Sequence, residues 1–218
     1  MENSAPGRIR FAEISAAWKS AMATPRLRAF ALGAGPALVG VLLVLRRFLD
    51  FIEARRGAAL NDPVLALFAP HDIALVLFPL MYLTMIGLLV ALIRHPKELV
   101  AGIWAYVLMI VVRMLVMYLL PLEPPSSMVA LRDPFVELFG EQRTLTRDLF
   151  FSGHTATLFL FALVVPTPRL RALAFTMAGL IASGVLLQHA HYTVDVVVAP
   201  FVSYACYRAA RALVTGHA

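Results

Sequence analysis

Two short polar stretches stand out in an otherwise apolar chain, and both contain histidine. In "QHAHYTVD", residues 188–195, His191 and Asp195 are four positions apart, a spacing that puts them on one face of a helix. An aspartate that accepts the N–H of one ring nitrogen fixes the tautomer and leaves the other nitrogen with a free lone pair. This pair therefore predicts a nucleophilic histidine. The alternative is a polar pair that only joins two helices.

The second stretch, "FFSGHTATLF" (residues 150–159), supplies another imidazole, that of His154. Its predicted role is to give a proton to a leaving oxygen and to take one from the incoming acceptor. The alternative is a histidine that caps the start of a helix. Ser152 and Thr155 suit helix capping, Gly153 permits close backbone approach, and the amides at that helix start could hold phosphate oxygens. Ser152 is not predicted to be a nucleophile, because no Gly-x-Ser-x-Gly motif surrounds it.

Further polar residues are candidates for contact with a substrate. Arg113 lies in the apolar stretch "VVRMLVMYLLP", where an unpaired guanidinium is costly, so we expect it to face a carboxylate or a phosphate. A structural ion pair with Asp148 or Asp195 is the alternative. His189 precedes His191 by two positions and would point to nearly the opposite face of a helix, so we expect a supporting or headgroup contact from it.

The histidines also raise the question of a metal site. His154, His189, His191 and Asp195 are all ligand types, but neither Glu-x-x-His nor His-x-x-x-His spacing occurs. We therefore predict no metal and no cofactor.

Composition indicates which elements must position these residues. Of the 218 residues 61% are hydrophobic and 15% charged, and the mean hydropathy is +0.80, so we expect the lipid bilayer to be the solvent. A membrane helix needs about 20 mostly apolar residues. The apolar segments predict an all-α, polytopic bundle of six transmembrane helices, at roughly 29–48, 72–93, 99–121, 150–166, 170–190 and 193–213.

The charge and cysteine content exclude other classes. A sequence pI near 10.0 could indicate nucleic-acid binding, but the basic residues lie at the ends of apolar segments rather than in one patch. We therefore predict no nucleic-acid partner. The single Cys206 excludes an internal disulfide.

The chain divides into an N-terminal segment, 1–26, and one membrane domain, 27–214. In the first segment Phe11, Ile14, Trp18 and Met22 recur at helical spacing, which predicts an amphipathic helix lying on the membrane surface. A helix packed on the bundle is the alternative. The segment lacks the features of a secretory signal, so we expect it to be retained.

The distribution of lysine and arginine favours a cytoplasmic N-terminus. With six spans, 11 of the 19 basic residues would then lie on the cytoplasmic side and seven on the other, with Arg113 inside a span. Both termini would be cytoplasmic, and His154 and His191 would meet at the opposite, non-cytoplasmic face. A composition rich in Ala and Arg but poor in Lys favours a bacterial inner membrane.

Two motifs resemble those of the sphingomyelin synthase family, within the broader group of lipid phosphate phosphatases. They are Asp-x-x-x-Ser-Gly-His-Thr at 148–155 and His-x-His-Tyr-Thr-Val-Asp at 189–195, and "RMLVMYLLPLEP" at 113–124 and "LND" at 60–62 resemble further family segments. The resemblance implies that His191 is the nucleophile, Asp195 its orienting partner and His154 the acid–base. It also implies substrate or phosphate contacts from Arg113, Asp148, Ser152, His189 and Tyr192.

The resemblance implies a reaction as well. In that family a histidine attacks the phosphorus of a phospholipid, diacylglycerol leaves, and an acceptor alcohol such as ceramide takes the headgroup phosphate. The expected partners are thus a phospholipid donor, a lipid-alcohol acceptor and the membrane, while homo-oligomerisation is left open. Departures leave the headgroup and the acceptor open: Thr146 and Arg147 replace a Cys-Gly pair, Val112 a tyrosine and Pro200 an aromatic residue.

Two alternatives to a headgroup transferase stand beside it. One is a lipid phosphate phosphatase or phospholipase C-like hydrolase of the same superfold, with water as the acceptor, whereas ceramide or diacylglycerol would be the acceptor of a transferase. The lack of a Lys-x-x-x-x-x-x-Arg-Pro string favours the transferase. The other is a non-enzymatic membrane protein. The long segment 122–147, with "FVELF" at 135–139, is interpreted as a lid or a substrate-entry lip over the site.

Overall fold

The computed structural model describes residues 11–131 and 145–216, and every regular element in them is a helix. This confirms the predicted all-α class; the predicted lip at 135–139 lies outside the described residues. An isolated bridge joins Ala58 to Leu122. The helices are α1 (Phe11–Met22), α2 (Pro25–Glu53), the single 3-10 turn η1 (Leu65–Leu67), α3 (Ala74–Leu92), α4 (Pro96–Leu119), α6 (Gly153–Val164), α7 (Pro168–Leu187) and α8 (Thr193–Thr215).

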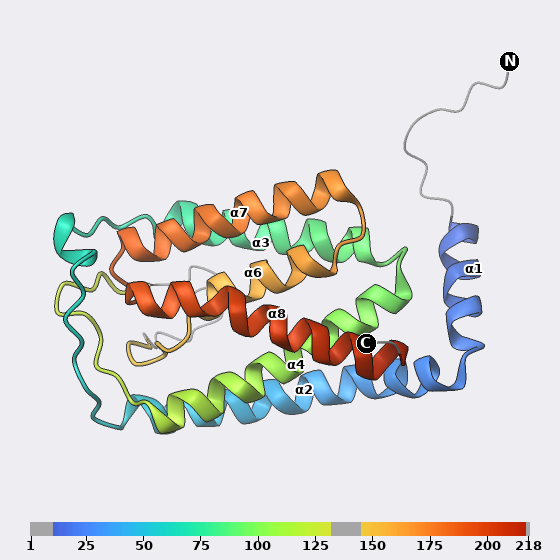
Figure 1. Ribbon diagram of the computed structural model, residues 1–218, viewed down its shortest axis with the longest axis horizontal. Coiled ribbons are helices and arrows are strands. Elements are labelled where there is room, and N and C mark those ends of the chain that lie inside the picture. The colour runs from blue at the N-terminus through green and yellow to red at the C-terminus, as the bar shows by residue number, and fades with distance from the viewer. Residues whose placement is uncertain (1–10, 132–144, 217–218) are drawn as a thin grey trace, which may run out of the picture.

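Helix α6 lies at the centre of the bundle. Figure 1 shows α2, α3, α4, α7 and α8 running along the long axis around it, with α1 crossing at the end where the C-terminus also lies. Helix α6 packs against α3, α4, α7 and α8. Four of its side chains are fully buried: Ala156, Leu158, Leu160 and Ala162. The site carried by its first turn is therefore enclosed by other helices.

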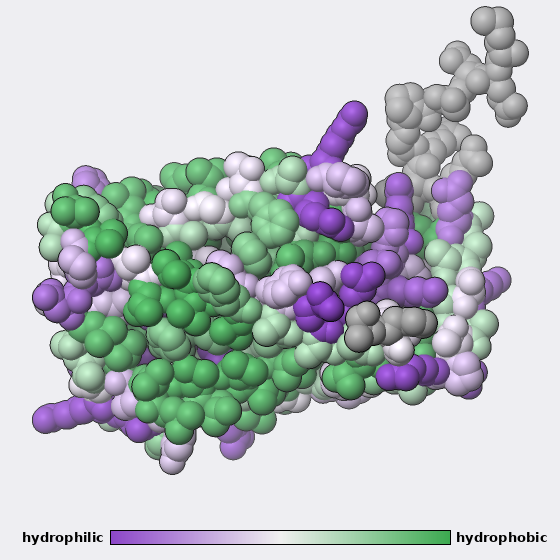
Figure 2. Space-filling view, in the orientation of Figure 1, coloured by the Kyte–Doolittle hydropathy of each residue, from purple (hydrophilic) through white to green (hydrophobic). Residues whose placement is uncertain are grey.

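The exterior is that of a membrane protein. Four helices, α2, α3, α4 and α7, are long and apolar enough to cross a bilayer. Large hydrophobic side chains such as Leu75, Leu83 and Phe201 are exposed. Figure 2 shows hydrophobic residues over much of the visible face, with hydrophilic residues gathered mainly towards the ends. Such a surface is stable when lipid covers it.

The prediction of a span at 150–166 is wrong in its extent. Helix α6 has only 12 residues, about 18 Å, whereas the hydrocarbon core is about 30 Å thick. Phe150 and Phe151 belong to the preceding loop, and Ser152 caps the helix. At the other end Val165 is extended, as expected of the residue before Pro166. The sixth predicted span, now α8, also falls outside the four apolar spans, so length and composition do not confirm the count of six.

Both ends of α6 are recessed within the bundle. Its last residue, Val164, contacts Gly102, which lies six residues, or about 9 Å, inside the start of α4. Its first residue, Gly153, contacts Arg113, which lies six residues, again about 9 Å, inside the end of α4. The helix thus occupies the middle of the bundle's depth.

Residues 11–22 form the predicted N-terminal helix, α1, and it is tied to the bundle. The Trp18 indole Nε1 donates to the carbonyl of Ile93, 3.0 Å away. Ala21 is buried in a cluster that includes Leu27, Val100 and Val214. Phe11, by contrast, is exposed. Contact with a membrane surface stays a prediction.

Candidate active site

His191 and Asp195 lie where α7 passes into α8. His191 sits in the joint at 188–192 and Asp195 in the first turn of α8, and their side chains are 3% and 0% exposed. Nδ1 of His191 is 3.4 Å from Oδ2 of Asp195, slightly long for a hydrogen bond. The same Oδ2 accepts the Tyr192 N–H at 3.0 Å, which fixes the carboxylate. Catalytic hydrogen bonds often tighten only when substrate binds.

His154 faces His191 from the first turn of α6. The ring centroids are 6.1 Å apart, with 63° between the ring planes. The edge of Phe78, from α3, packs against His154 at 5.8 Å between centroids. His154 is half-buried whereas His191 is buried. The two stretches that the sequence singled out therefore do converge, with one imidazole more accessible than the other.

The loop that begins α6 is held by its own cap. Ser152 Oγ accepts the Thr155 N–H at 3.4 Å and donates to the Thr155 hydroxyl at 3.1 Å. Ser152 is fully buried. This agrees with the predicted capping, while the predicted phosphate contact of Ser152 stays a prediction.

Arg113 is paired at the same place. Its Nη1 is 2.7 Å from Oδ1 of Asp148, and its Nε donates to the carbonyl of Phe151 at 2.8 Å. Nη2 donates to the carbonyl of Asp148 at 3.3 Å. A Cβ on Gly153 would lie only 3.0 Å from the guanidinium carbon, so the absence of a side chain there allows the approach. The guanidinium therefore braces the loop that leads to His154.

Tyr192 and His189 anchor the joint that carries His191. The Tyr192 hydroxyl donates to the carbonyl of Glu123 at 3.0 Å and accepts the Leu60 N–H at 3.2 Å. His189, buried and with φ 52°, has its Nδ1 2.6 Å from Ser127 Oγ. Both side chains thus contact protein, and their predicted contacts with a substrate stay predictions.

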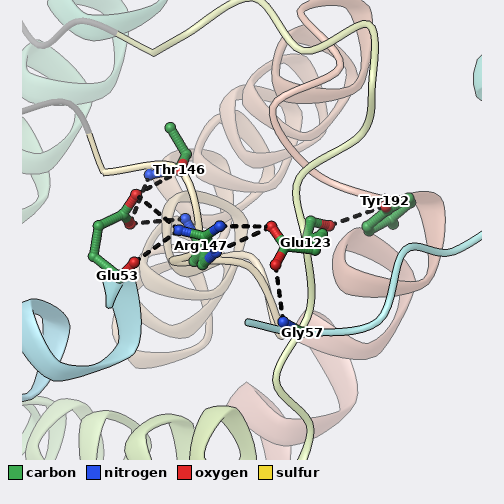
Figure 3. Close-up of polar contacts among 6 residues, drawn as sticks. All are labelled: Glu53, Gly57, Glu123, Thr146, Arg147 and Tyr192. Atoms are coloured by element: carbon green, nitrogen blue, oxygen red, sulfur yellow. Dashed lines mark hydrogen bonds and ion pairs between the residues drawn. The ribbon is translucent and has the colours of Figure 1, made fainter. Parts of the chain in front are cut away.

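Two acidic residues that the sequence analysis did not assign also hold the joint. Asp62 accepts the Thr193 N–H at 2.6 Å and the Thr193 hydroxyl at 3.1 Å, so it caps α8 from a distant loop. Burial raises the pKa of Asp62, but the hydrogen bonds from Thr193 and its neighbours outweigh burial and lower it overall. Glu123 accepts the Gly57 N–H and pairs with Arg147, and both contacts lower its pKa (Figure 3). Their partners lie 24 to 131 positions away, which is why spacing did not reveal them.

The described ranges, 11–131 and 145–216, contain no group of three or more His, Cys, Asp or Glu side chains placed to hold a metal ion. What the geometry offers is acid–base and nucleophilic chemistry. A phosphoryl group bound between His154 and His191 would have an attacking nitrogen on one side and a proton donor on the other.

Comparison with known families points the same way. Residues 147–212 match the family model described as PAP2 superfamily C-terminal. The matched range contains His154, His191 and Asp195. The match supports the PAP2, or lipid phosphate phosphatase, superfamily and a lipid enzyme of the phosphatase or phosphotransferase type. It does not reach the sphingomyelin synthase-like subfamily, and no curated protein matches the chain.

Proposed function

We propose that this protein is an integral-membrane phosphotransferase that moves the phosphate-linked headgroup of a phospholipid to a lipid alcohol. The observation that carries the proposal is the pairing of two histidines, 6.1 Å apart, with Asp195 behind one of them. A near-attack distance is about 3–3.5 Å from nitrogen to phosphorus. A proton donor must lie about 2.6–3.2 Å from the leaving oxygen. The 6.1 Å separation of the ring centroids brings both rings within reach of a single phosphoryl group, which is what these two requirements together demand.

The first half-reaction forms a phospho-histidine. The lone pair of His191 Nε2 attacks phosphorus, an N–P bond forms, and the P–O bond to diacylglycerol breaks. His154, protonated, gives its proton to the departing oxygen, so diacylglycerol leaves as a neutral alcohol. Asp195 stabilises the positive charge on the His191 ring and holds its Nδ1–H. His154 is then neutral and ready to act as a base.

The second half-reaction reverses these roles. A lipid alcohol, such as ceramide or diacylglycerol, gives its proton to His154 while its oxygen attacks phosphorus. The new P–O bond forms as the N–P bond breaks, and both histidines return to their starting states. His154 lies in the first turn of α6, where the positive end of the helix dipole favours negative charge on the phosphoryl oxygens.

The proposed orientation puts the site on the non-cytoplasmic face of a bacterial inner membrane. In support, the described part of the chain has nine basic residues at the end near its C-terminus: Lys19, Arg26, Arg28, Arg94, Lys97, Arg169, Arg171, Arg208 and Arg211. The opposite end has five in the described ranges: Arg46, Arg47, Arg55, Arg56 and Arg147. Under the positive-inside rule the richer end is cytoplasmic, and both termini lie there. The amphipathic α1 would rest on that surface, with α6 and α8 completing a bundle of six.

A second candidate function is a lipid phosphate phosphatase or phospholipase C-like hydrolase. The family match supports a lipid enzyme of the phosphatase or phosphotransferase type and so agrees with this function as well as with the first. The two functions share the first half-reaction and differ in whether water or a lipid alcohol meets His154 in the second.

The deciding experiment follows the headgroup. Purified protein in liposomes is given phospholipid labelled in the headgroup, together with ceramide, with diacylglycerol, or with neither. Label on a new lipid identifies a transferase, and label in the aqueous phase whatever acceptor is offered identifies a hydrolase. His191→Ala should abolish either outcome. If the wild type and His191→Ala give the same lipids for every headgroup, the protein is not this enzyme.

A further inference from the structure

Arg147 is the centre of a polar network at the end of the bundle that carries the histidines (Figure 3). Its Nε and Nη2 both donate to Oε2 of Glu123, at 3.0 and 2.8 Å. Its Nη1 donates to the carbonyl of Glu53 at 2.7 Å. The Glu53 carboxylate in turn accepts the N–H groups of Thr146 and Arg147, each at 3.0 Å. Each of the three guanidinium nitrogens therefore has a protein acceptor.

Glu123 connects Arg147 to the joint that carries His191. Its carbonyl accepts the Tyr192 hydroxyl at 3.0 Å, and Tyr192 follows His191 directly. Its other carboxylate oxygen accepts the Gly57 N–H at 2.9 Å. A Cβ on Gly57 would lie 2.5 Å from the backbone of Leu122, so the two segments meet as closely as backbone allows. The position of Glu123 is thus fixed on both sides.

Asp148, which follows Arg147 in the chain, contacts the segment that leads to the other histidine, His154. It pairs with Arg113, whose Nε holds the carbonyl of Phe151, three residues before His154. Two consecutive side chains therefore reach in different directions: Arg147 to the segment behind His191, and Asp148 to the loop in front of His154. Because Arg147 and Asp148 are adjacent in the chain, a single peptide bond connects these two sets of contacts.

We propose that Arg147 is a positioning residue, which together with Asp148 sets the separation of His154 and His191. The proposal rests on the proposed phosphotransfer, because that reaction needs both rings at fixed distances from one phosphorus. Without the Arg147 fork, residues 147 and 148 lose their side-chain tie to Glu123 and so to Tyr192, which leaves the contact between Ser152 and Asp195 to hold the His191 joint against α6. A misplacement of about 1 Å in an active site can cost about 100-fold in rate.

The test compares steady-state kinetics of Arg147→Met, Arg147→Lys and the wild type on the labelled phospholipid. For Arg147→Met we expect kcat to fall about 10- to 100-fold with little change in KM, because the site is misaligned but still binds lipid. Arg147→Lys should recover part of kcat, since an ammonium can pair with Glu123 but cannot replace the fork. If Arg147→Met proves unable to fold, Glu123→Gln carries the same test, since its amide oxygen can still accept the Gly57 N–H.

Arg55→Met is the matched control. Arg55 lies at the same end of the bundle and also donates to a backbone carbonyl, that of Tyr118, at 2.9 Å. It packs on the rings of Phe51 and Tyr118 and touches neither histidine loop. Its removal should leave kcat unchanged. Equal activity of Arg147→Met and Arg55→Met would overturn the proposal, and so would a raised KM with an unchanged kcat, which would make Arg147 a substrate ligand.

A second readout separates this proposal from the proposed function. His154→Cys and His191→Cys are introduced together in a Cys206→Ser background, and the two thiols are bridged with dibromobimane, which becomes fluorescent on bridging. Adding Arg147→Met should lower the bridging yield, and adding Arg55→Met should not. This result would stand even if the wild type turned over no lipid. An unchanged yield with Arg147→Met would overturn the positioning role whatever the activity.

Discussion

The backbone N–H of Ser152 donates a hydrogen bond to the backbone carbonyl of Asp195, with 3.1 Å between nitrogen and oxygen. The residue that caps α6 and the acidic residue beside His191 are thereby joined through their main chains. A second tie lies about one turn further along α6 and two turns further along α8, where Ser203 Oγ donates to the carbonyl of Ala156 at 3.0 Å. The N-terminal parts of α6 and α8 are thus joined at two points, and this shapes the predictions that follow.

Asp195→Asn should abolish most catalysis while leaving the fold intact. The amide oxygen can still accept the Tyr192 N–H, but the negative charge that supports the His191 imidazolium is lost. We expect the rate of phospho-histidine formation to fall by about 10³–10⁴-fold, as seen when a triad aspartate becomes asparagine. Single-turnover reactions quenched with alkaline detergent, in which phospho-histidine persists, and analysed by phosphorus NMR would measure it.

Asp72→Asn is the matched control for that variant, because Asp72 accepts the Ala74 N–H at the start of α3. It should keep nearly full activity. Phospho-histidine formation at the wild-type rate in Asp195→Asn would show that the His191–Asp195 pair only supports structure.

Gly153→Ala should disturb the site through Arg113. The added Cβ would lie 3.0–3.3 Å from three atoms of the guanidinium, which must then move away from Asp148 or Phe151. Overpacking of this kind costs about 1–3 kcal/mol. We expect a lower unfolding temperature and lower turnover. Gly179→Ala in α7, where a Cβ meets nothing within 4 Å, should be neutral or stabilising by up to about 1 kcal/mol. Equal behaviour of the two variants would contradict the close contact.

Arg113→Lys should destabilise the protein although it keeps the charge. A lysine cannot contact the Asp148 carboxylate and the Phe151 carbonyl through a rigid fork. Losing one hydrogen bond that involves a charged group costs about 1.5–3 kcal/mol. Thermal unfolding in detergent would measure the loss. Arg208→Lys, on the exposed face of α8, is the comparison and should have little effect, since Arg208 contacts only the Tyr204 side chain one turn away.

Stability should fall at acidic pH through Asp62 and Glu123. Both have a folded-state pKa below the ordinary values of 3.8 and 4.5. A lowered pKa means that the ionised form is favoured by folding, so its contribution is fully present above the ordinary pKa and is lost as pH falls through the lowered value. The unfolding temperature should therefore drop below about pH 4. Asp62→Asn should flatten part of that drop; an unchanged profile would show that the cap on α8 contributes nothing.

Local patterns in the sequence predicted most of the helices, and they singled out the two histidine stretches that lie side by side. The apolar segments gave α2, α3, α4, α7 and α8 to within a few residues, apart from an extended end of α2. The exception is α6, because apolar residues continue on both sides of it. There the Ser152 cap and Pro166, rather than hydropathy, determine where the helix begins and ends. At these two points the hydropathy of the sequence predicts a longer helix than the capping residue and the proline allow, and the helix ends where they do.

Long-range polar contacts are the part that spacing could not supply. Arg147 entered the sequence analysis only as a departure from the family pattern, yet it binds Glu123 and Glu53, 24 and 94 positions away. Asp62 reaches Thr193 across 131 positions. Such contacts form where loops that are distant in the sequence meet at one end of a bundle. The periodic spacing of residues within a helix or strand therefore cannot predict them. The His191–Asp195 pair was predictable because its spacing is local.

The recessed position of α6 makes the depth of the surrounding lipid matter for the proposed reaction. Gly153 contacts the guanidinium of Arg113, whose backbone lies about 9 Å inside the end of α4, so in that reaction a phosphate must leave the plane of the headgroups and enter the bundle to reach the histidines. A thinner bilayer brings that plane closer to the site, whereas longer acyl chains lift it away, and hydrophobic mismatch of this kind has a modest cost for each ångström. The turnover of one substrate should therefore vary with the acyl-chain length of the surrounding bilayer lipids, although these are not substrates. Through its short central helix, the activity of the protein would respond to membrane thickness.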